Sequence, residues 1–94
     1  MIRLTQAHID AFDRDGFVII ENVLTSAQID AARNRFEPMF SGKFQTGLYP
    51  DEWNWRMGRD APGLTRQICN GWKSDRVIAS IVLDPRVGEA CARL

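Results

Sequence analysis

The sequence LTRQICNGWKSD, residues 64–75, joins a short apolar run to the start of a helix, and its polar flanks raise the question of a site. Ile68 and Cys69 form its apolar centre. Because side chains alternate between the two faces of a strand, Arg66, Ile68 and Asn70 would share one face. Arg66 and Asn70 could then hold a carboxylate or an amide. The alternative is an edge strand whose polar side faces water, and spacing alone leaves both possibilities open.

Two helices are predicted after this stretch. Ser74 is placed to act as the N-cap of the first, and Asp84 with Pro85 at the first helical position begins the second. Helical spacing groups their apolar residues into one stripe each, which we expect to be covered by further protein. The stripes contain Val77, Ile78, Ile81 and Val82, and then Val87, Ala90, Cys91 and Leu94.

The N-terminal part is predicted to be helix, strand, helix. Thr5 is a good N-cap for the first helix, and Gly16 supplies a left-handed stop. Residues 17–20, FVII, are aromatic or β-branched and predict a short buried strand. Overall we expect an α+β chain that is mostly helical, with one or two short strands.

The second helix is predicted to begin at a capping box and to end early. Thr25 and Gln28 have the spacing of that box, in which each side chain bonds the other residue's backbone N–H. Pro38 should end or kink the helix near Phe36, because proline lacks the N–H that a helix interior requires.

Residues 41–63 have no helical or alternating period and predict a long loop, yet this loop is rich in aromatic residues. Trp53 and Trp55 would point the same way if the segment is extended. They are candidates for the wall of a ligand pocket, or they cover part of the core. Stacking on nucleic-acid bases is disfavoured because the formal net charge of the chain is zero.

Metal chemistry is not expected from these residues alone. His8 is the one histidine, and His8 and Asp10 fall on a predicted helix, where positions two apart diverge by about 200° and cannot clamp one metal. Cys69 and Cys91 match no zinc or redox spacing. No signal-peptide run and no apolar run long enough to span a membrane is present, so we expect a soluble cytoplasmic protein that binds neither nucleic acid nor membrane.

The order of these features is similar to a known family. LTQAHIDAFDRDGFVIIENVLTSAQIDAARNRFEPMF, residues 4–40, resembles the start of the phytanoyl-CoA dioxygenase family, where a Leu-Thr-capped helix leads to a DGFVII-type segment and a second capped helix. TRQICNGWKSDRVIASIVLDPRVGEACARL, residues 65–94, resembles the continuation in bacterial members.

The resemblance implies a non-haem Fe(II), 2-oxoglutarate-dependent oxygenase on a double-stranded β-helix of the jelly-roll or cupin-like type. Such an enzyme hydroxylates an unactivated C–H bond of a small organic acid or thioester. The family's His-x-Asp pair and distant His, which bind iron, follow the region matched here. Residues 1–94 are therefore expected to be an incomplete N-terminal segment with no metal ligand and no catalytic residue of its own, not competent alone, and not expected to bind iron or 2-oxoglutarate by itself.

Carried over by position, Arg66 and Gln67 lie where family members place cosubstrate or substrate contacts. Asn70, Trp72 and Lys73 are further candidates in the same stretch.

Two other hypotheses stay open. One is a small non-catalytic module that binds a partner or oligomerises through exposed apolar helix faces. The other is a domain that binds a carboxylate ligand through Arg66 and the pair of tryptophans.

Overall fold

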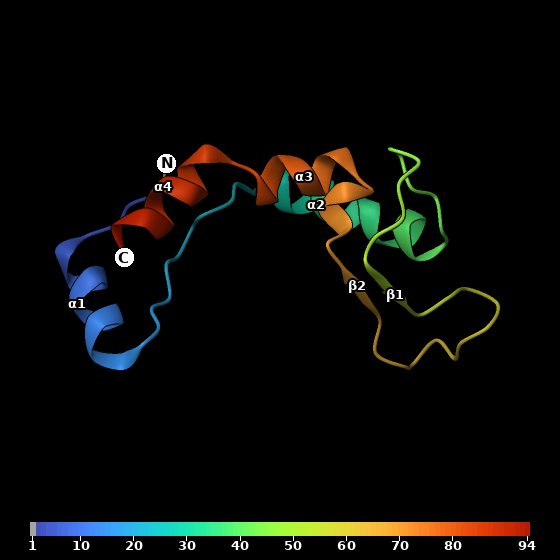
Figure 1. Cartoon of the computed structure of the whole chain (residues 1–94), viewed down its shortest axis with the longest axis horizontal. Coiled ribbons are helices and arrows are strands. Elements are labelled where there is room, and N and C mark those ends of the chain that lie inside the picture. The colour runs from blue at the N-terminus through green and yellow to red at the C-terminus, as the bar shows by residue number, and fades with distance from the viewer. Residues whose placement is uncertain (1) are drawn as a thin grey trace.

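The computed structural model describes residues 2–94 as four α-helices, a short 3₁₀ helix and a two-stranded antiparallel sheet, so the predicted α+β class is confirmed (Figure 1). In chain order the elements are α1 (Gln6–Asp15), α2 (Ser26–Phe40), β1 (Glu52–Asn54), β2 (Gln67–Cys69), the 3₁₀ helix η1 (Gly71–Lys73), α3 (Arg76–Val82) and α4 (Pro85–Arg93). In the sheet, Trp53 lies opposite Ile68.

The molecule is elongated and has two lobes, as Figure 1 shows. One lobe holds α1, α4 and both ends of the chain; the other holds α2, α3, η1 and the sheet. The radius of gyration is 16.1 Å, whereas a compact chain of this length would have about 12 Å. The accessible surface is 6761 Å², against about 5,500 Å² for a compact protein of this mass. Much apolar surface therefore stays uncovered within one chain.

The helix caps predicted from the sequence are mostly confirmed. The hydroxyl of Thr25 accepts a hydrogen bond from the Gln28 backbone at 3.1 Å, and the Gln28 side chain accepts one from the Thr25 backbone at 2.8 Å. Thr5 caps α1, which ends at Gly16 with φ of 78°. Asp84 caps α4. These ends form as predicted because each depends on residues close in sequence.

The cap of α3 is a correction, because Asp75 and not Ser74 occupies it. The Asp75 carboxylate accepts hydrogen bonds from the backbone of Val77 at 3.0 Å and of Ile78 at 3.1 Å. Ser74 instead closes η1, where its N–H donates to the Gly71 carbonyl at 3.0 Å. The 3₁₀ turn takes up the residues up to Ser74 and so moves the start of α3 by one position.

The predicted end or kink of α2 near Phe36 is wrong as a boundary, because α2 continues through Pro38 to Phe40. Pro38 lies in the last turn, where its missing N–H removes one bond. The carbonyls of the final turn still find donors, since Ser41 N–H reaches Glu37 O and residue 43 N–H reaches Pro38 O. Met39, which is buried, holds the turn against the rest of the lobe.

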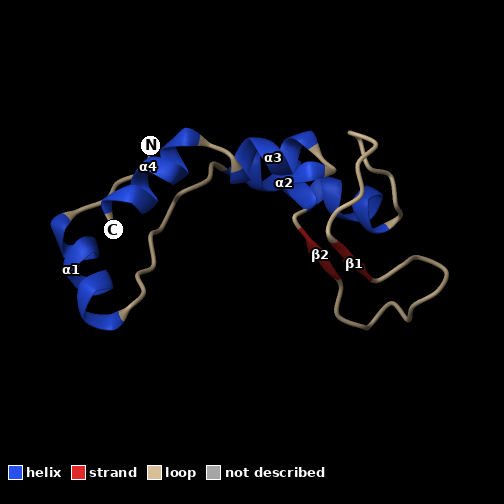
Figure 2. Cartoon of the chain, in the orientation of Figure 1, coloured by secondary structure: helices blue, strands red, loops and turns tan. Residues whose placement is uncertain are grey.

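The predicted buried strand at residues 17–20 is also wrong. These residues are extended but belong to no sheet, and Phe17 and Ile19 are exposed, the latter by 76%. A strand needs a neighbour for its N–H and C=O groups, and the one sheet of residues 2–94 lies in the other lobe (Figure 2). The connector between α1 and α2 therefore runs from one lobe to the other without pairing to a strand.

The loop predicted at residues 41–63 contains β1, which the sequence did not indicate. β1 is only three residues long and forms because Asp51 N–H donates to the Cys69 carbonyl and Trp53 pairs with Ile68. The pairing brings the loop back over the C-terminal half of α2, so most of the core lies in this lobe.

Candidate functional site

A cleft of about 390 Å³ opens between α2, β2, η1 and α3. Its lining is apolar apart from one arginine. The lining residues are Phe36, Met39, Phe40, Arg66, Ile68, Gly71 and Ile78. The three α2 residues fall at helical spacing, so they lie on one face of that helix and form one wall of the cleft.

Gly71 brings the turn after β2 close to α2. A Cβ at this position would lie 2.8 Å from Met39 Cε and 3.2 Å from Ile68 Cγ2. Both distances are below ordinary contact, so with a larger residue either the Met39 methyl group or the turn would have to shift. The glycine therefore allows the turn and Met39 to approach closely where both line the cleft.

Arg66 is the one charged side chain of the lining. Its Cζ lies 3.8 Å from the centre of the Trp55 ring and 5.8 Å from that of Phe40. Its Nη1 donates to a carboxylate oxygen of Glu37 on α2 at 2.7 Å. Stacking on an aromatic face fixes the plane of the guanidinium and leaves its edge open to acceptors.

Trp55 is the support for that arginine. It is 5% exposed, its Nε1 donates to the Ala61 carbonyl at 2.9 Å, and its ring meets Phe40 edge to face at 6.2 Å. The Ala61 carbonyl and the Phe40 ring together hold the indole in place. Of the two tryptophans proposed as pocket walls, Trp55 thus lies beside the cleft, behind Arg66.

Trp53 lies in a separate aromatic cluster. Its ring centre is 5.2 Å from that of Phe44 and 6.3 Å from that of Tyr49, and the Arg56 guanidinium lies 4.2 Å above it. Gly42 passes directly beneath the ring, since a Cβ there would lie 2.7 Å from Trp53 Cη2. The structure therefore does not bring the two tryptophans together as one wall.

Asn70, Trp72 and Lys73 form a second group around Asp51. Lys73 Nζ lies 2.6 Å from one Asp51 oxygen, Asn70 Nδ2 donates to the other, and Trp72 Nε1 donates to Asn70 Oδ1 at 3.2 Å. The hydrogen bond from Lys73 and then that from Asn70 lower the pKa of the Asp51 carboxyl below 3.8. The network ties η1 to the start of β1, so these polar groups serve the fold.

Gln67 lies apart from Arg66, as alternation along β2 predicts. Its side-chain amide lies 3.2 Å from the sulfur of Cys69 on the same strand. Among the sequence candidates, Arg66 and Trp55 therefore meet at the cleft; Gln67 and Trp53 lie elsewhere, and the three residues around Asp51 form their own group. Glu37 and Asp51 were missed, because partners 29 and 22 residues away leave no local signal.

Residues 2–94 do not bring together a set of side chains that could hold the iron of the phytanoyl-CoA dioxygenase family. No group of three or more His, Cys, Asp or Glu side chains comes together there. His8 Nδ1 accepts the Thr5 backbone N–H at 3.0 Å and completes the cap of α1. Its Nδ1 is thus engaged at a helix end, and among the described residues His8 belongs to no group of three potential ligands.

Comparisons of the sequence with protein-family models and with curated proteins, and of the structure with solved structures, find no match. Within residues 2–94, no helix is both long and apolar enough to cross a bilayer.

Proposed function

We propose that this chain is the N-terminal flank of a non-haem Fe(II), 2-oxoglutarate-dependent dioxygenase of the phytanoyl-CoA dioxygenase type, in which it packs against the catalytic double-stranded β-helix and forms one side of the substrate pocket. The substrate would be a small organic acid or thioester. The observation that carries the proposal is Arg66, a stacked guanidinium at an otherwise apolar cleft.

The uncovered apolar surface supports a flanking role. Phe36 at the cleft and Val82 at the end of α3 are exposed although helical spacing puts them on apolar faces, and Leu83, which follows α3, is exposed as well. A body packed against these faces would remove them from water, which is the main favourable term in protein association. Free thiols at Cys69 and Cys91 suit the cytoplasm, where we place the protein.

In this family iron, 2-oxoglutarate and O₂ together supply the oxidant for hydroxylation, O₂ being reduced while 2-oxoglutarate is converted to succinate and CO₂. Since residues 2–94 offer no ligand set for the metal, the present chain would contribute only binding: an apolar surface for the body of the substrate and a cation for its acid group. Under this proposal the iron ligands would come from polypeptide beyond residue 94.

The proposal is tested by reading the gene past residue 94 and assaying the encoded protein. A His-x-Asp pair on a predicted strand and formation of succinate from 2-oxoglutarate with Fe(II) are expected, and residues 1–94 alone should form none. A longer protein without that pair and without 2-oxoglutarate turnover would refute the dioxygenase assignment. Turnover by the 94-residue chain alone would refute the claim that this chain is only a flank without catalytic machinery.

A second candidate function is self-association as a non-catalytic module. The unpaired, exposed segment at residues 17–20 favours it, because an extended chain with open N–H and C=O groups can add to another sheet edge. The surface in excess of a compact protein is about 1,200 Å², more than the ~800 Å² that each partner buries in a stable dimer.

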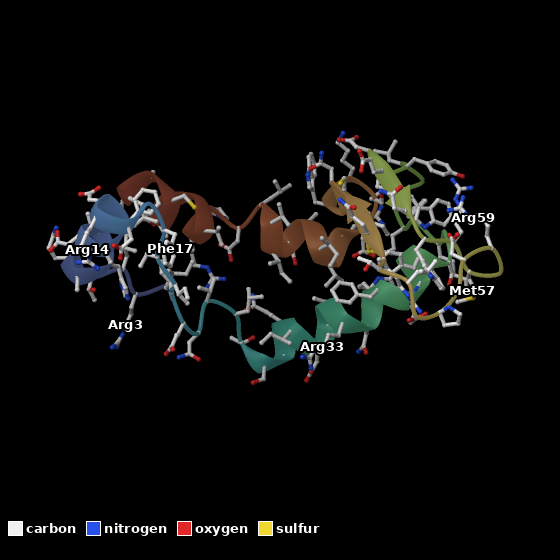
Figure 3. All side chains as sticks on the ribbon, turned by 90° about the horizontal axis from the view of Figure 1, so that it is seen from below. Arg3, Arg14, Phe17, Arg33, Met57 and Arg59 are labelled. Atoms are coloured by element: carbon white, nitrogen blue, oxygen red, sulfur yellow. The ribbon has the colours of Figure 1, made fainter. Side chains whose placement is uncertain are left out.

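Sedimentation of the chain and of Ile19→Lys separates the two functions. A module of this kind should sediment as a dimer that Ile19→Lys dissociates, while Arg3→Ser, at an exposed site away from the connector (Figure 3), should leave it intact. A monomer at all concentrations would remove this candidate.

A further inference from the structure

We propose that the cleft between α2 and α3 binds a monocarboxylate with an apolar body, such as an arylalkyl acid, with its carboxylate on Arg66. This deepens the proposed function, since it names the class of acid at the same site and so rests on it for its biological meaning. The binding itself depends only on the geometry of residues 2–94, and its test needs neither iron nor turnover.

The apolar part of the ligand follows from the lining. Six of the seven lining residues are apolar or glycine, and they come from α2, β2, η1 and α3. The volume of about 390 Å³ lies in the range of small-molecule sites. Met39 is buried at the base of the cleft, whereas Phe36 is exposed at its edge. An aromatic ring or a short hydrocarbon chain fits such a surface.

The free hydrogen-bond donors of Arg66 indicate that the ligand carries a carboxylate. Its side chain is only 26% exposed, and of its donors Nη1 alone has an acceptor among residues 2–94. The Nε and Nη2 donors form the fork that binds a carboxylate in two parallel hydrogen bonds. Because the guanidinium carbon lies 3.8 Å from the centre of the Trp55 ring, contact with the indole restrains the guanidinium before a ligand arrives.

A single charge on the ligand follows from what surrounds Arg66. No second cation lines the cleft in the part of the chain that the structure describes. The second carboxylate of a diacid would lie among apolar side chains or near Glu37, and burying an unpaired charge is strongly unfavourable. The cleft is thus suited to the substrate and not to 2-oxoglutarate.

Glu37 acts as an internal competitor at this site. Its carboxylate already occupies one Arg66 donor at 2.7 Å, and its side chain is mostly exposed. A bound acid would share Arg66 with this negative charge. Glu37→Gln keeps a hydrogen-bond acceptor while removing the charge, so it should strengthen acid binding.

The test is calorimetry and amide NMR on the full 94-residue chain with 3-phenylpropionate, its neutral amide and 2-oxoglutarate. The acid should bind about tenfold tighter than the amide, the difference that one charge-assisted contact supplies, and tighter than 2-oxoglutarate. The amide signals of Ile68, Gly71 and Ile78 should shift. Absence of acid binding, or equal affinity for acid and amide, would overturn the proposal.

Three variants assign the effect to Arg66. Arg66→Gln should lose the preference for acid over amide, and Glu37→Gln should raise acid affinity several-fold by removing the competing charge. Arg33→Gln is the matched control, since Arg33 points from α2 into solvent (Figure 3). If Arg66→Gln does not fold, an unchanged affinity in Glu37→Gln overturns the proposal. Acid binding without 2-oxoglutarate turnover by the longer protein would retain this inference and refute the dioxygenase assignment.

Discussion

At the scale of single residues, two buried neighbours just before α3 differ in what they contribute to stability. Ser74 and Asp75 are both fully buried. Asp75 caps α3 and accepts from Arg35 Nε on α2 at 2.7 Å. The Ser74 hydroxyl has no hydrogen-bond partner within residues 2–94. One polar side chain therefore holds the two helices together, while the other is buried without compensation.

Asp75→Ala should destabilise the chain by about 3 kcal/mol, because it removes a helix cap and leaves Arg35 without its partner. Ser74→Ala should be neutral or stabilising by about 1 kcal/mol, because it removes an unsatisfied buried hydroxyl. Urea unfolding monitored by tryptophan fluorescence measures both. A large loss in Ser74→Ala would mean that the hydroxyl has a bonded partner, such as a buried water.

Asp84 gives a pH-dependent prediction at the start of α4. Hydrogen bonds from the Arg86 side chain and then from its backbone lower the pKa of Asp84 from 3.8 to about 2. A lowered folded-state pKa contributes stability that is fully present above 3.8 and is lost as pH falls through about 2. The α4 amide signals should therefore change in this window. Asp84→Asn, which cannot titrate, should remove the transition, and its persistence in that variant would contradict the assignment.

At the scale of elements, the caps could be predicted from sequence and the sheet could not. Thr25 and Gln28 are three residues apart, so their reciprocal bonds follow from local spacing. Trp53 and Ile68 are brought together by a long loop, and no local pattern marks their register. For the same reason the sequence indicated Arg66 as a candidate but not the Glu37 carboxylate that contacts it. The connector at residues 17–20 has strand-like residues, but a strand also requires a neighbour that the chain does not provide there.

In the loop before β1, we expect substitution of Gly42 to cost more stability than substitution of Gly47. Gly42 and Gly47 have φ of 80° and 76°, a left-handed conformation that costs other residues about 1–2 kcal/mol. Only Gly42 also contacts the Trp53 ring, so Gly42→Ala should lose about 1–3 kcal/mol beyond that cost by overpacking. Gly47→Ala, where nothing lies within 4 Å, should show the backbone cost alone. Equal losses in urea unfolding would mean that the indole moves aside freely.

At the scale of the whole molecule, the two lobes differ in what holds them. The lobe of α2, α3 and the sheet contains Met39, Trp55, Ser74 and Asp75, whereas in the lobe of α1 and α4 only Leu4 is buried among the described residues. Leu4 lies beside α4, where the Arg93 side chain donates to its carbonyl at 3.5 Å. Because the lobe of α1 and α4 has few buried contacts and exposed backbone hydrogen bonds, it should unfold locally at low free energy.

Hydrogen exchange should therefore protect α2 and α3 more strongly than α1 and α4 in the isolated chain, because local opening follows the density of buried contacts. The comparison is made residue by residue by NMR, with Met39 and Ala79 on one side and Phe12 and Ala90 on the other. If a β-helix covers the chain in a longer enzyme, protection of α1 and α4 should rise to the level of α2. Equal protection in the isolated chain would instead mean that the two lobes unfold as one cooperative unit, with the link between α3 and α4 rigid enough to couple them.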